Sequence, residues 1–321
     1  FLVFTYNNSS STRNWPDHNV RGRIENSSNI EFYRYRSSGT INGTYYLIEA
    51  INEEFKVQHL EQSMSGSSHS IEIPEEVEAH RTFFVSSYYS TRDYDDTYDN
   101  TVVSVLNSNK EIESSRYHNY SSVYTNVQVV ELNRVGKVFV NHNRYIFIDS
   151  SISEHTGNFP TVLSGSKVMV FNSSCNQATR TNGTRASDIP DSFFILKKNN
   201  GNTYIAKRNS TGENSYLAPQ FIDWDGYSFD YSDSISENVS DLVKSVEHIS
   251  TTISGGDATQ YYKYLPLNKN QDWKYCVPFC TYMAHNNEHR DNKCDVNISA
   301  GPILTLYRGN DSVDCEVEIF V

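Results

Sequence analysis

The sequence predicts a mainly β protein, an antiparallel β-sandwich of immunoglobulin-like or jelly-roll-like type, with one amphipathic helix near residues 235–250. Composition is the first indication, because aromatic residues reach 13% with 23 Tyr while hydrophobic residues make up only 37%. Such a chain favours half-buried strands over helices. The second indication is that Tyr, Phe, Val and Ile recur in short clusters throughout, which disordered chains lack. Asn, Ser and Gly separate these clusters, as they do in turns between antiparallel strands.

Alternation of apolar and polar residues predicts twelve strands. They are residues 44–50, 55–57, 82–88, 101–106, 123–132, 137–140, 144–148, 167–171, 192–197, 203–207, 303–307 and 316–321. Two hairpins are expected among them. Residues 138–141 and 145–148 flank His142-Asn143, and residues 193–196 and 204–206 flank an Asn- and Gly-rich tetrapeptide that suits a tight turn.

One segment has helical periodicity instead. Ser234 or Ser236 would cap its start, and Gly255-Gly256 follows its end. Its apolar residues recur at the spacing of one helix face. They are Ile235, Val239, Leu242, Val243, Val246 and Ile249. We expect this helix to cover one face of a sheet.

The length of the chain accommodates two β-rich regions. We predict an N-terminal and central sandwich region at residues 1–171. A second region at residues 172–321 would contain the helix and a cysteine-containing C-terminal module. The Ser-rich residues 63–70 and the loop at 172–188 mark the softest points, and no internal repeat is visible in the sequence.

Asn-x-Ser/Thr tripeptides, the acceptor signals for N-linked glycans, occur eleven times. Chance would give about 6 or 7 in a chain of this composition. The asparagines are Asn7, Asn8, Asn26, Asn42, Asn119, Asn172, Asn182, Asn209, Asn238, Asn297 and Asn310. Glycans at these positions would place them on the surface of a secreted protein. We therefore expect an extracellular location, at a cell or virion surface, with N-linked glycans and no cofactor.

Charge and hydropathy exclude some partners. The net charge of -12, with 27 basic residues, argues against nucleic acid, whose phosphates need a positive surface. No run of about 18 apolar residues is present, so no membrane span is expected. The chain starts at Phe1 without an initiator Met, which we interpret as a mature product after removal of a leader.

Four of the five cysteines lie close to the C-terminal end. They are Cys276, Cys280, Cys294 and Cys315. Oxidising extracellular conditions favour disulfides among them, and three pairings are open. Cys175 is then either a buried thiol or paired between subunits.

Two kinds of metal site were weighed against simpler interpretations. A zinc site would use Cys276, Cys280, His285, His289 and Cys294, but thiols in a secretory compartment become disulfides first. Calcium candidates are Asp93, Asp95, Asp99, Asp223 and Asp225, in two acidic runs. Solvated acidic loops explain both runs equally well, so the sequence predicts no metal.

We expect no enzyme activity. The sequence contains no G-x-S-x-G elbow, phosphate-binding glycine loop, H-E-x-x-H motif or dinucleotide fingerprint.

The N-terminal hexapeptide is the most apolar in the chain. It consists of Phe1, Leu2, Val3, Phe4, Thr5 and Tyr6. In this respect the chain resembles the subunits of donor-strand-exchange, pilus-like fibres, in which an N-terminal extension completes the incomplete sandwich of a neighbour. The resemblance implies that the hexapeptide is a subunit contact in a homopolymer. Donor strands usually alternate, whereas residues 1–4 are apolar on both faces, so pairing within its own domain is the alternative.

Residues 130–148 carry a second resemblance. The run Gly136-Lys137-Val138-Phe139-Val140-Asn141, followed by Tyr145-Ile146-Phe147, is similar to a strand pair in coronavirus spike N-terminal domains. Heavy glycosylation fits this family too.

The sequence thus predicts an extracellular, glycosylated structural or adhesive protein. The first hypothesis is a subunit of a surface filament assembled by strand exchange, whose partners are copies of itself. The alternative is a receptor-binding ectodomain of a viral or cellular surface glycoprotein, whose partner is a carbohydrate or another cell-surface ligand.

Overall fold

Antiparallel β-strands make up nearly all of the regular structure. The computed structural model describes residues 1–8, 18–50, 53–91, 100–133, 138–142, 145–158, 167–172, 180–181, 193–199, 203–224, 246–255, 262–267, 276–284, 294–299, 303–308 and 314–321. Within these ranges the one helical element longer than a single residue is the 3-10 turn η1 (Ala79–Arg81). None of the described helices has the length and apolarity to cross a membrane. The mainly β, antiparallel prediction is confirmed.

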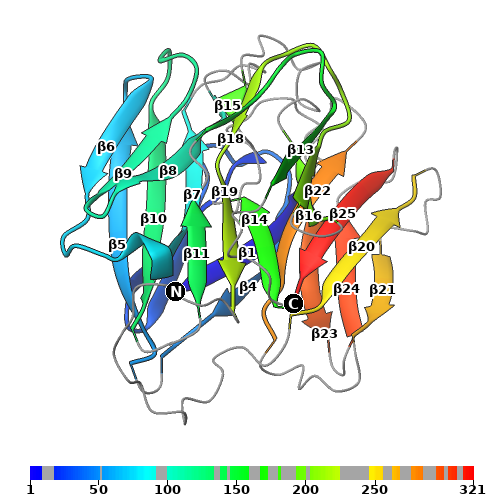
Figure 1. Ribbon diagram of the computed structural model, residues 1–321, viewed down its shortest axis with the longest axis horizontal. Helices are drawn as coiled ribbons and strands as arrows, with labels where there is room; N and C mark the ends of the chain where they lie inside the picture. The colour runs from blue at the N-terminus through cyan, green and yellow to red at the C-terminus, as the bar shows by residue number, and fades with distance from the viewer. Residues whose placement is uncertain are drawn as a thin grey trace.

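The strand order shows three consecutive units that share one topology and lie side by side (Figure 1). In each unit the first, sixth and third strands form one sheet, and the second, fifth and fourth strands form another. The first unit, cyan in Figure 1, contains β5 (Phe55–Met64), β6 (Ser68–Glu72), β7 (Thr82–Ser90), β8 (Val103–Ser108), β9 (Glu111–Ser115) and β10 (Val123–Leu132).

The second unit, green in Figure 1, has the same order with three of its six strands interrupted. These are β11 (Phe139–His142) with β12 (Ile146–Ile148), β14 (Val168–Asn172) with β15 (Arg180–Thr181), and β18 (Ser215–Leu217) with β19 (Pro219–Asp223). The other three are β13 (Glu154–Asn158), β16 (Ile195–Lys198) and β17 (Thr203–Lys207).

The third unit, yellow to red in Figure 1, repeats the order of the first. It contains β20 (His248–Ile253), β21 (Tyr262–Pro266), β22 (Phe279–Ala284), β23 (Cys294–Ser299), β24 (Ile303–Arg308) and β25 (Cys315–Phe320). The internal repeat that the sequence did not reveal is therefore a repeat of topology.

A buried arginine marks the same point in every unit, at the end of the fifth strand. Arg116, Arg208 and Arg308 are each at most 1% exposed. The guanidinium of Arg116 donates to Gly66 O, that of Arg208 to Ile152 O and that of Arg308 to Ser254 O. All three acceptors lie between the first and second strands of their unit, where the two sheets separate. The arginine therefore satisfies backbone carbonyls that the strand ladders leave there.

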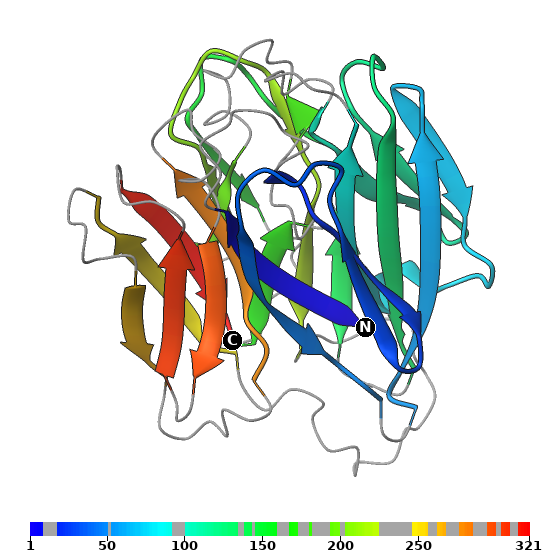
Figure 2. The same cartoon turned by 180° about the vertical axis from the view of Figure 1, so that it is seen from behind.

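An N-terminal ribbon lies across the units, and Figure 2 shows it from behind in blue. β1 (Leu2–Asn8) pairs antiparallel with β4 (Ile41–Leu47), and between them in sequence come β2 (Arg21–Asn26) and β3 (Asn29–Tyr33), which form a hairpin. The side-chain amide of Gln128 in β10 binds both the N–H and the C=O of Leu2, at 2.8 and 2.9 Å. Gln220 in β19 binds Phe84 of β7 in the same way, at 2.9 and 2.7 Å.

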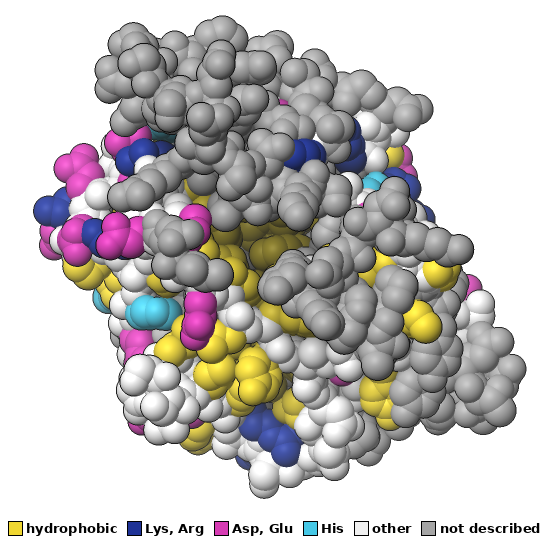
Figure 3. All heavy atoms as spheres, turned by 90° about the horizontal axis from the view of Figure 1, so that it is seen from below, with side chains coloured by type: hydrophobic (Ala, Val, Ile, Leu, Met, Phe, Trp, Pro, Cys, Tyr) yellow, Lys and Arg dark blue, Asp and Glu magenta, His cyan; other side chains and the backbone are white. Residues whose placement is uncertain are grey.

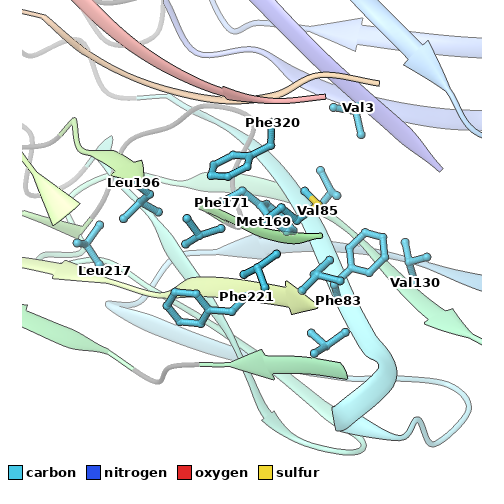
Figure 4. Packing of buried hydrophobic residues seen from close by; sticks show 14 of the residues in the cluster. Val3, Phe83, Val85, Val130, Met169, Phe171, Leu196, Leu217, Phe221 and Phe320 are labelled. Atoms are coloured by element: carbon cyan, nitrogen blue, oxygen red, sulfur yellow. The ribbon is translucent and has the colours of Figure 1, made fainter. Parts of the chain in front are cut away.

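The largest cluster of buried side chains is shared by the ribbon and the units. Val3 of the ribbon, Phe83 of the first unit, Phe171 and Phe221 of the second and Phe320 of the third all belong to it (Figure 4). Hydrophobic burial therefore joins the units into one body.

Three sequence predictions about the fold are wrong. β11 pairs with β19 and β12 with β18, so residues 138–141 and 145–148 form no hairpin with each other. The division between residues 171 and 172 falls inside β14, whose partner β19 lies in the other predicted region. The helix near residues 235–250 lies mostly outside the described residues, and its described end, from His248, is strand β20 paired with β25. There, Ile249, Thr251 and Ile253 alternate with polar residues, which suits a strand.

Candidate binding site

A pocket of about 370 Å³ opens between the β2–β3 hairpin and the β1–β4 ribbon. Its lining is Phe4, Thr5, Tyr6, Val20, Phe32, Tyr33, Arg34, Ile41, Gly43, Thr44 and Tyr45. The volume falls in the range of sites that hold small ligands or anchoring side chains. Among the described lining residues, Arg34 carries the one formal charge.

Exposed aromatic rings form the rim of this pocket. Phe32 is 43% exposed, Tyr33 41% and Tyr45 54%. The Phe32 ring lies 5.9 Å from that of Tyr45 and 5.2 Å, edge to face, from the buried ring of Phe4. Tyr35 and Leu47, beside the pocket, are exposed as well. Hydrophobic side chains also gather around a hollow on the face seen from below (Figure 3).

Two glycines allow the floor of the pocket to form. A Cβ atom on Gly43 would lie 2.7 Å from Thr5 O, so β4 could not approach β1 this closely with a larger residue. A Cβ on Gly22 of β2 would lie 2.6 Å from the Phe4 ring. Phe4 can therefore pack between ribbon and hairpin only because β2 has no side chain at that point.

The hairpin is held against the first unit by charge and by ring contacts. Arg23 binds Glu31 of β3 at 2.5 Å and Glu61 of β5 at 2.6 Å. The ring of Tyr33 lies 4.7 Å from that of Tyr89 in β7. The rim residues consequently stand on a braced element.

Arg34 fixes the connection from β3 to β4. Its Nη1 and Nη2 atoms donate to Ser38 O at 3.1 Å and Gly39 O at 2.8 Å. Gly39 has a φ of 71°, a conformation that glycine adopts without strain. The guanidinium is thus held at the pocket by its own loop.

Behind the pocket, hydroxyl groups of the ribbon bind the third unit. Thr5 and Thr44 donate to the carboxylate of Asp295 in β23, and the N–H of Thr44 donates to it at 2.9 Å. The hydroxyl of Tyr46 accepts from the N–H of Ile298 at 3.1 Å. Burial raises the pKa of Asp295, and these hydrogen bonds offset part of that rise. Burial also raises the pKa of Tyr46 to about 12, so its hydroxyl stays protonated.

The hexapeptide predicted as a subunit contact lies inside its own chain. The residues from Leu2 to Tyr6 pair with β4, and their side chains are buried. The N-terminal amine donates to Ile48 O at 2.6 Å. The intramolecular alternative therefore describes this structure, because β4 and the neighbouring units already provide the apolar groove that the strand needs.

The structure separates the glycosylation signals into three groups. Exposed asparagines are Asn26, Asn42, Asn119, Asn209 and Asn297. Buried asparagines are Asn7, Asn8 and Asn172. Asn182, Asn238 and Asn310 lie outside the described residues. Glycans at the exposed positions are compatible with this fold, whereas the buried amides have no room for one.

The C-terminal cysteines converge, although the structure has Cys276, Cys280, Cys294 and Cys315 as thiols and contains no bridge among them. Cys280, Cys294 and Cys315 come from three strands of the third unit and share one buried cluster. Burial first, and then the nearby Cys315 and Cys280, raises the pKa of the Cys294 thiol. A disulfide within this trio stays our prediction for oxidising conditions. Cys175 lies outside the described residues.

The metal candidates are scattered. His285, His289, Asp93, Asp95, Asp99 and Asp225 lie outside the described residues, and Asp223 is buried at the end of β19. Among the described residues no group of three or more His, Cys, Asp or Glu side chains could hold a metal ion.

Sequence reasoning missed the pocket. The signal was present in Phe32-Tyr33-Arg34-Tyr35-Arg36, where aromatic residues and arginines adjoin one another within a chain of net charge -12. Tyr and Arg are enriched in the energetic centres of binding surfaces.

Comparisons of the chain with protein-family models, with curated proteins and with solved structures found no match.

Proposed function

We propose that this protein is an extracellular, glycosylated adhesive protein that binds a partner at a cell or virion surface through the pocket between β2–β3 and β1–β4. The observation that carries the proposal is the rim of exposed Phe32, Tyr33 and Tyr45 around a pocket whose described lining has one charge, on Arg34. Exposed apolar surface costs solubility, so a braced aromatic rim favours a contact surface.

The glycosylation signals support the extracellular part of the proposal. Five of them, including Asn119 and Asn209, are exposed. Asn42 is next to Gly43 on β4, and successive residues of a strand point to opposite faces. A glycan there would extend away from the face that carries Gly43 and Tyr45.

For the fold we propose a sandwich within each unit. In the first unit, Phe84 and Val127 of one sheet share a buried cluster with Leu106 and Ile112 of the other. Such shared burial supports two packed layers.

We propose adhesion without strand exchange. Filament assembly by exchange would have to withdraw β1 from β4, from Gln128 and from the shared core. The alternative of a receptor-binding ectodomain needs no such step, and a folded unit with a surface pocket supports it.

Cell binding of the glycosylated protein, measured by flow cytometry, tests the proposal. Tyr45→Ser should reduce binding strongly, because the ring is half exposed at the rim. Tyr120→Ser is the matched control, since Tyr120 is 66% exposed and does not line the pocket. Equal binding by both variants and the parent protein would contradict the proposed site.

A further inference from the structure

The surface around Arg34 continues beyond the pocket, and this extension indicates what occupies it. Tyr35 and Leu47 are 46% and 45% exposed, yet neither lines the pocket. Tyr45 lies between the pocket and Leu47 on the same face of β4, because residues two apart in a strand share a face. The contact surface is therefore larger than one small ligand needs.

Its residue types favour a protein partner. Aromatic residues and Arg are enriched at protein interfaces, and their centres are pockets that receive an anchoring side chain from the partner. An exposed leucine adds apolar contact to a peptide, whereas it offers a sugar neither a hydrogen bond nor an aromatic face. The surface thus differs from a saccharide site.

The charge of the pocket determines the anchor. The protein carries a net charge of -12, but the charge among the described lining residues is the positive one of Arg34. Arg34 is positioned by Ser38 O and Gly39 O, so its planar guanidinium is oriented before any ligand arrives. A guanidinium binds a carboxylate through two parallel hydrogen bonds.

We propose that the pocket receives an acidic side chain from a partner protein, in a segment where Asp or Glu is flanked by apolar residues. The carboxylate binds Arg34, and the flanking apolar side chains contact Phe32, Tyr45 and Leu47. This inference rests on the proposed function, because it names the class of partner for the same site.

Paired synthetic peptides test the proposal. Each peptide on an array contains Asp or Glu between apolar residues, and its twin contains Asn or Gln instead. Binding of the glycosylated protein is measured by fluorescence polarisation for every pair that gives a signal. We expect acidic peptides to bind at least about 10-fold more tightly than their twins, the effect of one charge-assisted contact.

Two substitutions separate the charge of Arg34 from its role in the loop. Arg34→Gln and Arg34→Lys both lose the fork that binds Ser38 and Gly39, but Lys keeps the charge. Arg34→Gln should abolish the preference for acidic peptides and Arg34→Lys should retain part of it. Equal loss in both variants, no preference in the parent protein, or binding of saccharides instead of peptides would overturn the proposal.

Cell binding distinguishes this failure from failure of the proposed function. If no acidic peptide binds while Tyr45→Ser still removes cell binding, the pocket is the binding site and its partner is of another class. If Tyr45→Ser leaves cell binding unchanged, the proposed function itself fails.

Discussion

Replacing Arg208 with Met removes the guanidinium that joins the sheets of the second unit. Its side chain donates to Ile152 O at 3.0 Å, Asp149 O at 2.8 Å, Glu213 O at 2.6 Å and Ser215 Oγ at 3.1 Å. The substitution leaves three buried carbonyl groups without these donors. Met fills much of the volume, so the loss of hydrogen bonding dominates over cavity formation.

The expected cost follows from those contacts. An unsatisfied buried polar group costs about 1–3 kcal/mol, and breaking a buried charged contact costs about 3–5 kcal/mol in total. We expect Arg208→Met to lower the free energy of unfolding by about 3–5 kcal/mol. Urea titration followed by circular dichroism measures this as a lower midpoint.

Arg23→Met is the control. Arg23 also binds two partners, but its side chain is 25% exposed and those of Glu31 and Glu61 are 39% and 45% exposed. Partly solvated ion pairs contribute about 1 kcal/mol or less. If Arg208→Met lowered the midpoint no more than Arg23→Met, the buried arginine would not hold the unit together.

Four further predictions concern the ribbon, the cysteines and the glycans. Val3→Asp with Phe4→Asp should lower the melting temperature and reduce the β-sheet circular dichroism signal, because both side chains are buried in the protein's own core; an intact spectrum would restore the strand-exchange interpretation. The raised pKa of Asp295 means that the folded state holds the proton more tightly, so this group favours folding at acidic pH and its contribution is lost as pH rises from the unfolded value of 3.8 through the folded pKa. Asp295→Asn should therefore gain stability relative to the parent protein over that rise, and urea midpoints that diverge in the opposite direction would refute it. Peptide mapping without reductant should find one disulfide among Cys280, Cys294 and Cys315, whereas complete alkylation of the denatured, unreduced protein would exclude it. Glycopeptide mass spectrometry should find glycans at Asn119 and Asn209 and none at Asn172, and a glycan at Asn172 would contradict the burial of that side chain.

Local patterns predicted the strands well. The predicted segment 123–132 is β10, the segment 203–207 is β17, and the second predicted hairpin is the pairing of β16 with β17. Alternation and turn residues specify these features because both act over a few residues.

Long-range pairing was beyond the sequence patterns. β11 pairs with β19, which begins at Pro219, and no local signal distinguishes that partner from the nearer residues 145–148. The repeat was hidden because its units share few residues. Gln128 and Gln220 each lie twelve positions after the buried arginine of their unit, but Phe320 takes that position in the third. Phe320 packs in the shared core instead.

The pocket could be predicted only in part. The aromatic and Arg-rich residues 32–36 could have been identified as a contact segment, but the floor comes from Phe4, Thr5 and Tyr6 of β1 and from Gly43 of β4. Only the folded ribbon brings these residues together.

A glycan placed at the pocket tests the central claim, that this surface binds the partner. Leu47→Asn with Glu49→Thr creates a glycosylation signal beside Tyr45 without altering the pocket lining. Ser151→Asn creates one before Ile152-Ser153, on the exposed surface of the second unit, as the control. We predict that the first glycan abolishes cell binding, that the second leaves it intact, and that enzymatic deglycosylation restores binding to the first variant. Full cell binding by the variant glycosylated at position 47 would contradict the account.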